Sequence, residues 1–285
     1  MQKVVVIYKA SSAEALELAR RLAGWLGQRG RAVLLHEAQA AAEPAEAAEP
    51  GLDLPPDCGL VVVLGGDGTM LGAVREVVRA GLEQAPILGV NLGGLGFLTA
   101  LAPEELTPAL TMVLEGQYAA PPRLMLEAAV HRDGRVLRRV VALNDVVINK
   151  AALARIVELK LCVDEKPLTV FRADGLIIST PTGSTAYNLS AGGPICHPSL
   201  DCIVVTPICS FALSNRPLLL GPQMTLSVEL GRRAQDTTLT SDGQVGVELL
   251  PGDRITIRRA GPSVRLVQSP FKDYFEILRT KLRWG

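Results

Sequence analysis

The chain has 285 residues, more than a typical single domain, so we expect two domains with a substantial core. Its 29 Lys and Arg residues balance its 29 Asp and Glu residues, and this balance disfavours nucleic acid and anionic membranes as partners. No apolar run is long enough to span a membrane, and the chain begins without the pattern of a signal peptide. We therefore expect a cytoplasmic protein that acts on a small charged ligand.

The pattern of the five cysteines also indicates the cytoplasm. None belongs to a CxxC pair, and no histidine lies at the spacing of a zinc site. We expect them to be buried thiols in a reducing cytosol: Cys58, Cys162, Cys196, Cys202 and Cys209.

The first third of the chain alternates strand-like and helix-like segments. Ser11 and Glu14 have the spacing of a capping box, which predicts the start of the first helix. Alternation of this kind is typical of a parallel α/β sheet. The expected strands are 4–8, 32–35, 60–64 and 87–90, and the further expected helices are 70–79 and 103–114. The segment 38–50, rich in Ala, Glu and Pro, is expected to be a mobile surface connection.

The second half of the chain is expected to be mainly β. Short strands with period-two alternation follow one another, separated by turn residues such as Asp133-Gly134. The tail changes again, because Ser269-Pro270 precedes a helical pattern with Phe271, Tyr274, Phe275, Leu278 and Leu282 on one face. We expect an α/β domain at 1–120, completed by the helix at 269–285, and a β-rich domain at 121–268.

A glycine-rich run, Gly65-Gly66-Asp67-Gly68-Thr69, follows a buried strand and precedes a helix. Glycines in this position can bring backbone amides close to phosphate oxygens. The run lacks the spacing and the lysine of a Walker A loop, and it lacks the spacing of the dinucleotide fingerprint. A carboxylate in such a loop would accept a proton from an attacking hydroxyl while a divalent cation offsets the phosphate charge. The alternative is an ordinary strand-to-helix turn in which Asp67 caps the helix.

A second polar stretch, Asp174–Asn188, runs from a strand into a loop rich in hydroxyl groups. These hydroxyls need hydrogen-bond partners, and sugar hydroxyls, amides or phosphates of a ligand would serve. A Ser/Thr-rich turn bonded to its own backbone is the alternative interpretation.

With these two stretches and three others, the chain resembles the NAD kinase family, and the resemblance covers most of its length. It rests on five stretches: Gly65–Thr69, Asn91–Thr99, Leu143–Val147, Asp174–Pro194 and Leu213–Pro217. The glycine run alone also occurs in the wider superfamily of lipid kinases and phosphofructokinases, whereas Asp174–Pro194 looks specific to NAD kinases.

The resemblance implies that Asp67 is the general base for the 2′-hydroxyl of the adenosine ribose of NAD. It implies that Gly65, Gly66, Gly68 and Thr69 contact the phosphate donor, which is ATP or polyphosphate. Magnesium or manganese is expected to accompany ATP, and no metal site built from protein side chains alone is required.

The resemblance also places a set of residues on NAD, several of which have a plainer structural alternative. Arg155 and Arg172 could be solvated surface arginines, Phe97 could be core, and Gln244 follows an ordinary hairpin turn. The implied NAD-binding residues are Asp67, Gly68, Phe97, Asn144, Asp145, Arg155, Arg172, Asp174, Thr185, Ala186, Tyr187, Asn188, Ser190 and Gln244. Ser210-Phe211 departs from the Pro-His often found before the Leu-Ser-Asn-Arg-Pro motif, which puts a contact from that segment in doubt.

The family therefore implies an enzyme that transfers the γ-phosphoryl group of ATP to NAD, giving NADP, in a homodimer or homotetramer. A lipid or sugar kinase would share the glycine run but would leave the Thr182–Asn188 cluster without an evident ligand. A non-catalytic dinucleotide-binding sensor would use the same polar loops, with Asp67 serving only as a helix cap.

Overall fold

The computed structural model describes residues 3–38, 51–151, 156–212, 214–232, 234 and 236–284. The chain forms two compact units. The first contains the described residues up to 122 and those from 263 onward, and the second contains the described residues between them. Residues 263–268, which the sequence prediction assigned to the β-rich domain, thus belong to the first unit. The expected connection at 38–50 lies, apart from its first residue, outside the described residues.

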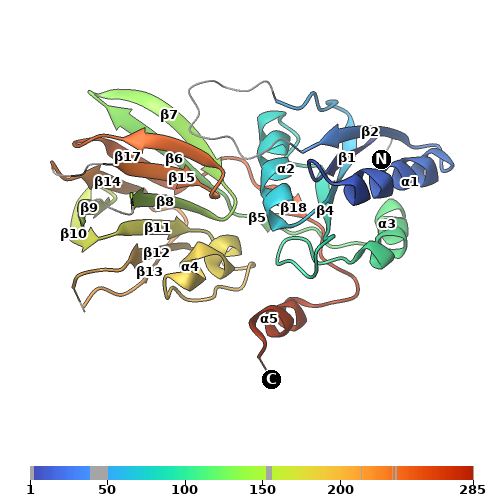
Figure 1. Ribbon diagram of the computed structural model, residues 1–285. Coiled ribbons are helices and arrows are strands. Elements are labelled where there is room, and N and C mark those ends of the chain that lie inside the picture. The colour runs from blue at the N-terminus through green and yellow to red at the C-terminus, as the bar shows by residue number, and fades with distance from the viewer. Residues whose placement is uncertain are drawn as a thin grey trace. The chain divides into compact units, whose positions relative to one another are not determined.

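The first unit is built on a six-stranded sheet in the order β2-β1-β3-β4-β18-β5 (Figure 1). The first five strands of this order pair in parallel. Runs of Val, Ile and Leu form the central strands because both faces of a parallel sheet are covered by helices. The strands are β1 (Lys3–Tyr8), β2 (Ala32–Glu37), β3 (Cys58–Leu64), β4 (Pro86–Val90), β5 (Pro122–Arg123) and β18 (Val264–Leu266).

Helices cover both faces of this sheet. On one face, α1 (Ala13–Gly27) and α3 (Leu106–Leu114), the latter preceded by the short helix η1 (Pro103–Glu105), share one apolar cluster with the strands. The helix α2 (Asp67–Arg79) lies on the opposite side of the sheet (Figure 1). The expected α/β class with a parallel sheet is confirmed for this unit.

The first helix begins one residue later than the capping pattern predicted. Ser12 is the N-cap, and its Oγ accepts a hydrogen bond of 3.2 Å from the N–H of Ala15. Ser11 instead has a positive φ of 55° and donates its own N–H to Glu37 at 2.8 Å. The Ser11–Glu14 capping box is therefore wrong, because the chain turns sharply at Ser11 before the helix starts.

We expect Ser12→Ala to lower the free energy of unfolding by about 1 kcal/mol, since it leaves an N-terminal helix N–H without its side-chain acceptor. Ser11→Ala is the matched control and should change the free energy by less than about 0.5 kcal/mol. Urea unfolding followed by circular dichroism measures both. An equal loss in the two variants would contradict the assignment of the cap to Ser12.

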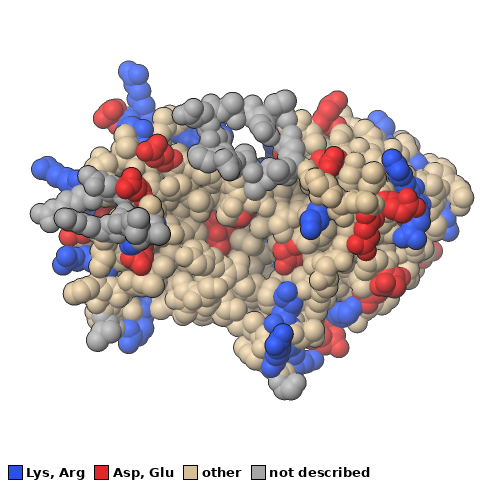
Figure 2. Space-filling model, in the orientation of Figure 1, with Lys and Arg blue, Asp and Glu red and all other residues tan. Residues whose placement is uncertain are grey.

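The C-terminal helix α5 (Tyr274–Leu282) returns to the first unit, as expected. Its N-cap is Asp273, which forms a capping box with Glu276, so Phe271 precedes the helix instead of lying on its apolar face. Ile277 and Leu278 are the buried residues of the helix, whereas Phe275 is 56% exposed. Basic side chains gather on α5, as Figure 2 shows, among acidic and basic residues that are interspersed over the rest of the face drawn.

An ion pair between Lys272 and Glu105 fixes the segment that leads into α5. Burial alone would raise the pKa of Glu105, but hydrogen bonds from Lys272 and from the N–H of Ala102 lower the pKa below its usual value. The pair therefore favours the ionised carboxylate and ties the start of α5 to η1.

The second unit is a sandwich of two antiparallel six-stranded sheets, in the orders β10-β9-β14-β17-β6-β7 and β13-β12-β11-β8-β15-β16. One apolar cluster contains residues of both sheets. The first sheet consists of β6 (Leu126–Arg132), β7 (Arg135–Ala142), β9 (Val157–Val163), β10 (Lys166–Ala173), β14 (Leu226–Leu230) and β17 (Arg254–Arg259). The second consists of β8 (Asp145–Lys150), β11 (Gly175–Ser179), β12 (Ile203–Ile208), β13 (Leu218–Leu220), β15 (Thr237–Ser241) and β16 (Val245–Leu249).

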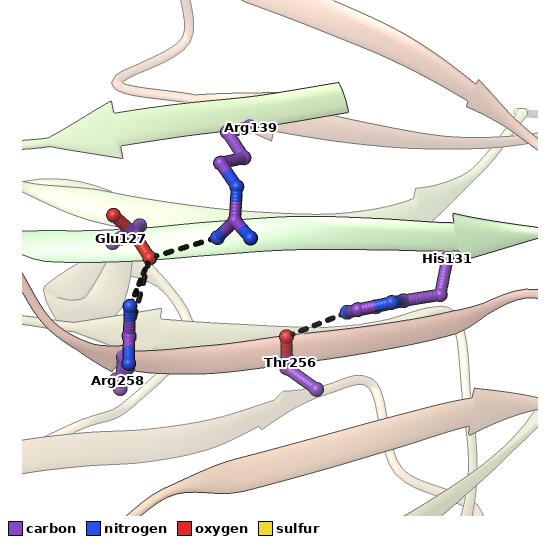
Figure 3. Close-up of polar contacts among 5 residues, drawn as sticks. All are labelled: Glu127, His131, Arg139, Thr256 and Arg258. Atoms are coloured by element: carbon purple, nitrogen blue, oxygen red, sulfur yellow. Dashed lines mark hydrogen bonds and ion pairs between the residues drawn. The ribbon is translucent and has the colours of Figure 1, made fainter. Parts of the chain in front are cut away.

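Polar pairs connect neighbouring strands β6, β7 and β17 of the first sheet (Figure 3). Glu127 accepts hydrogen bonds from Arg139 at 3.2 Å and from Arg258 at 2.9 Å, and His131 Nε2 lies 2.9 Å from Thr256 Oγ1. Each pair joins adjacent strands, so these contacts support strand pairing.

The cysteines are all free thiols, but they are not all buried. Cys58 and Cys196 are buried, Cys162 and Cys202 are partly buried, and Cys209 is exposed. The expectation of five buried thiols is wrong for Cys209, because it lies in the turn that follows β12, where its φ is 46°.

None of the helices in the described ranges is long and apolar enough to cross a membrane.

Candidate functional site

The glycine run connects β3 to α2. Its first amide, the N–H of Gly65, donates to Val90 O at 2.9 Å, and Gly66 is the N-cap of α2. The helix thus starts at Asp67, three residues before the predicted start. Gly65 is required for space, because a Cβ there would lie 2.4 Å from Thr69 Oγ1. The loop therefore presents backbone at a helix N-terminus, an arrangement that favours anions.

The Asp67 carboxylate is held by the loop that follows β4. Its Oδ1 accepts from the N–H of Leu98 at 3.1 Å, the N–H of Thr99 at 3.1 Å and the hydroxyl of Thr99 at 2.8 Å. Its Oδ2 accepts from the N–H of Phe97 at 2.9 Å. Each carboxylate oxygen has about two acceptor positions, so Oδ1 is fully used, whereas Oδ2, with one bond, keeps a lone pair; together the bonds fix the orientation of the carboxylate.

The Asn91–Thr99 stretch, recognised as a motif in the sequence, is therefore the support of Asp67. Asn91 donates from Nδ2 to Thr99 Oγ1 at 2.8 Å and accepts the N–H of Gly93 at 2.9 Å. A Cβ on Gly96 would lie 2.2 Å from Asp67 Oδ1, so only glycine lets the carboxylate approach this loop. The sequence alone connected neither Asn91 nor Thr99 to Asp67.

In the second unit, Asn144 and Asp145 lie where β8 begins. The carboxylate of Asp242 accepts the backbone N–H groups of Leu143 at 2.9 Å, Asn144 at 2.7 Å and Asp145 at 3.1 Å. Asp242 occupies the β15–β16 hairpin turn with a positive φ of 51°. The sequence reading treated this Asp-Gly as an ordinary hairpin turn. Its turn geometry was visible in the sequence, but its long-range contact was not.

The side chains of Asn144 and Asp145 are poorly satisfied within the part of the chain that the structure describes. Asn144 Oδ1 is buried and has no hydrogen-bond partner there. Asp145 is 4% exposed. Burial, and secondly the negative charge of Asp242, raises the pKa of Asp145 from 3.8 to about 7. Buried acceptors without donors are costly, so this pair is suited to a ligand that donates hydrogen bonds.

The raised pKa of Asp145 predicts a pH-dependent stability. The unfolded chain releases this proton near pH 3.8 and the folded protein near pH 7, so the free energy of unfolding falls as the pH rises between these values. We expect Asp145→Asn to remove this component, which amounts to up to about 4 kcal/mol. Urea unfolding at several pH values measures it. Asp133→Asn, at an exposed hairpin turn, should keep the wild-type slope, and equal slopes in wild type and Asp145→Asn would contradict the assignment.

The hydroxyl-rich segment after β11 forms η2 (Thr182–Thr185) and α4 (Tyr187–Ser190). The hydroxyl of Thr180 donates to Leu143 O at 2.6 Å, and that of Ser184 donates to Pro181 O at 2.7 Å. These two hydroxyls, like that of Ser179, bond to the backbone, as the Ser/Thr-turn interpretation proposed. A Cβ on Gly183 would lie 2.1 Å from Asn144 O, so this glycine brings the segment against the Asn144–Asp145 turn.

The predicted residues within this segment differ in accessibility. Tyr187 is 42% exposed, Ser190 is exposed, and Thr185 and Ala186 are partly buried. Asn188 is fully buried; its Nδ2 donates to Ser184 O and Pro194 O, both at 3.0 Å, and its Oδ1 accepts from Thr206 at 2.7 Å. The Asn188 side chain is thus engaged in holding the segment together.

Asp174 lies between β10 and β11, and its carboxylate pairs with Lys150 at 3.4 Å. Arg172 is exposed; it lies 3.6 Å from Glu158, and its guanidinium lies 5.7 Å from the centroid of the Phe211 ring. Phe211, the departure from the family pattern, is 71% exposed, and its N–H donates to Arg172 O. Arg155 lies outside the described residues.

Gln244 lines a cavity of about 550 Å³ together with Asp236 and residues of β15 and β16, including Thr238 and Thr240. Threonine hydroxyls and a side-chain amide can bind sugar hydroxyls or amides. In the first unit, Phe97 is partly buried and Lys281 lies 5.7 Å from its ring centroid. The described residues include no group of three or more His, Cys, Asp or Glu side chains that could hold a metal ion.

Two family models match the chain. The ATP-NAD kinase N-terminal domain matches residues 4–118, and the ATP-NAD kinase C-terminal domain matches residues 143–269. Among curated proteins, the NAD kinase of Geotalea daltonii is 49% identical and that of Syntrophotalea carbinolica is 48% identical. Each alignment covers 100% of this chain and 99% of the relative.

Two solved structures share the fold. The yeast NADH kinase complexed with NADH has a TM-score of 0.81 at 24% identity, covering 100% of this chain and 88% of that chain. An NAD kinase from Archaeoglobus fulgidus in complex with ATP has a TM-score of 0.76 at 25% identity, with 99% of each chain covered. Neither the sensor nor the lipid or sugar kinase interpretation finds support in these comparisons.

Proposed function

Since the chain belongs to the NAD kinase family and phosphorylates NAD to NADP, we propose that Asp67 is the general base of this reaction. The single observation that carries the proposal is the orientation of the Asp67 carboxylate by four hydrogen bonds. Oδ1 takes three of them, so Oδ2 is the atom that accepts the proton of the adenosine 2′-hydroxyl. The hydroxyl oxygen then attacks the terminal phosphorus of ATP, the bond from that phosphorus to its bridging oxygen breaks, and ADP departs on the opposite side.

We expect Asp67→Asn to lower kcat by about 100-fold or more while the dissociation constant of NAD changes less than about threefold. An asparagine can keep an oxygen at the position of Oδ1 and so preserve most of the loop contacts, but it does not accept the proton. The measurement is steady-state formation of NADP with ATP and magnesium, combined with calorimetric titration of NAD. Asp57→Asn, which removes an exposed carboxylate near the start of β3, is the matched control and should retain wild-type turnover. Wild-type kcat in Asp67→Asn would exclude the general-base role.

Asn144 and Asp145 are proposed to bind the hydroxyl or amino groups of NAD. Support comes from the buried Asn144 Oδ1 without a partner and from the buried Asp145 carboxyl, which a hydrogen-bond donor would stabilise in its charged form. Asp242 would act indirectly by fixing the backbone of this pair.

The remaining predicted NAD contacts are proposed in two roles. Exposed or partly exposed groups, among them Tyr187, Ser190 and Asp174, are available to touch the dinucleotide. Asn188 is proposed to act as a positioning residue, because its amide is already bonded within its own segment. Arg172, Thr185, Ala186, Gln244, Phe97 and Gly68 complete the proposed NAD-binding residues, and Arg155 remains a proposal from the sequence alone.

ATP is the phosphoryl donor of this family, and we propose that magnesium or manganese arrives with it. The glycine run fits this ion, because magnesium in such sites is held largely by substrate phosphates and water, and the N-terminus of α2 offers backbone N–H groups to those phosphates. The ion would neutralise charge on the transferred phosphoryl group. Gly65, Gly66, Gly68 and Thr69 are proposed to bind the donor through backbone groups and one hydroxyl, with polyphosphate as a second possible donor. We further propose that the enzyme acts in the cytoplasm as a homodimer or homotetramer.

A further inference from the structure

Binding of a phosphate donor in the first unit requires more positive charge than the glycine run supplies. ATP carries several negative charges, and Asp67 adds another to the same loop. The Gly65–Thr69 run contains no Lys or Arg, and neither does the supporting loop Asn91–Thr99. Backbone amides and one divalent cation offset part of this charge, so a basic side chain from another segment would strengthen binding.

The sheet topology indicates where such a residue should lie. In the order β2-β1-β3-β4, the chain runs from β1 to β2 at one edge of the sheet. After β3 it runs in the opposite direction, to β4. Ligands of open parallel sheets bind beyond the carboxyl ends of the strands at the point where this direction changes, which here lies between β1 and β3. The glycine run begins at the carboxyl end of β3, so the neighbouring segment is the one that follows β1.

The hydrogen bonds of Asp67 divide this region into an acceptor side and a donor side. The carboxylate is held by Phe97, Leu98 and Thr99, which follow β4, and Phe97 is itself a proposed NAD contact, so the acceptor is placed on the β4 side of Asp67. In-line transfer places the leaving group on the opposite side of the phosphorus. The rest of the donor therefore extends toward β1, the other neighbour of β3.

Lys9 is the first residue after β1, and its backbone N–H donates to Leu64 O at 2.8 Å, directly before Gly65. Its side chain is exposed. It is the only Lys or Arg in the segments that follow β1, β3 and β4, namely 9–12, 65–69 and 91–99. The neighbouring strand β2 contributes an acidic side chain to this segment, because Glu37 accepts the N–H of Ser11.

We propose that Lys9 binds the phosphates of the donor on the side of the glycine run away from the acceptor. The proposal rests on the assignment of Gly65–Thr69 as the donor loop and of Asp67 as the base. Lys281 serves for comparison, because it is a cation that lies over Phe97 on the acceptor side.

The test compares Lys9→Met with Lys9→Arg and two controls. Lys3→Met removes the same charge from the other end of β1, where Lys3 pairs with Asp57 at 2.8 Å, and Lys281→Met removes a cation from the acceptor side. KM values for ATP and for NAD are measured for each variant. The dissociation constant of adenylyl imidodiphosphate with magnesium is measured by calorimetry in the absence of NAD, and thermal unfolding checks the fold.

We expect Lys9→Met to raise the KM for ATP and the dissociation constant of the analogue by about tenfold or more, with the KM for NAD changed less than about twofold. Lys9→Arg should recover most of the loss, and Lys3→Met should behave as wild type. A KM for ATP within about twofold of wild type in Lys9→Met would overturn the proposal, as would a rise seen only in Lys281→Met. If wild-type protein formed no NADP, the proposed function would fail, and the titration with the analogue would still decide whether Lys9 binds phosphate.

Discussion

The hydrogen bonds between the Asp67 carboxylate and the loop at Phe97–Thr99 are the interaction on which the first unit's site depends. In the loop that we propose binds phosphate, a carboxylate would repel the ligand unless it took part in the reaction, and proton transfer requires a carboxylate of fixed orientation. The loop supplies that direction through backbone amides, which no side-chain substitution can remove. Gly96 makes the approach possible, since any Cβ there would occupy the space of the carboxylate.

In the second unit, another carboxylate, that of Asp242, fixes the backbone of the candidate site. Asp242 gathers three backbone N–H groups and thereby fixes the turn that presents Asn144 and Asp145. The same negative charge, added to burial, keeps Asp145 partly protonated near neutral pH. This arrangement lowers stability at higher pH, and it leaves acceptors ready for a ligand. Conflicts of this kind between stability and binding are expected at functional sites.

Sequence reasoning identified what depends on local pattern. The parallel sheet, the β-rich second half and the returning helix followed from periodicity and turn residues, whereas the role proposed for Asp67 came from its place between glycines and from the family resemblance. Predictions from local pattern were wrong where the path of the folded chain determines the outcome. Ser12 caps α1 because Ser11 turns the chain, and Cys209 is exposed because it lies in a turn. The roles of Thr99 and Asp242 were hidden because their partners lie 32 and about 100 residues away along the chain. The hydroxyls of Thr180 and Ser184 looked like ligand contacts but bond to the backbone.

The central claim is that the loop after β4 orients Asp67 for proton transfer, and Thr99 tests it most directly. Thr99→Val is nearly isosteric and removes the hydroxyl that donates to Asp67 Oδ1, whereas Thr99→Ser keeps it. We expect kcat to fall about tenfold in Thr99→Val, with the KM values for NAD and ATP nearly unchanged, and to stay near wild type in Thr99→Ser. A wild-type kcat in Thr99→Val, measured on protein with an unchanged melting temperature, would contradict the account.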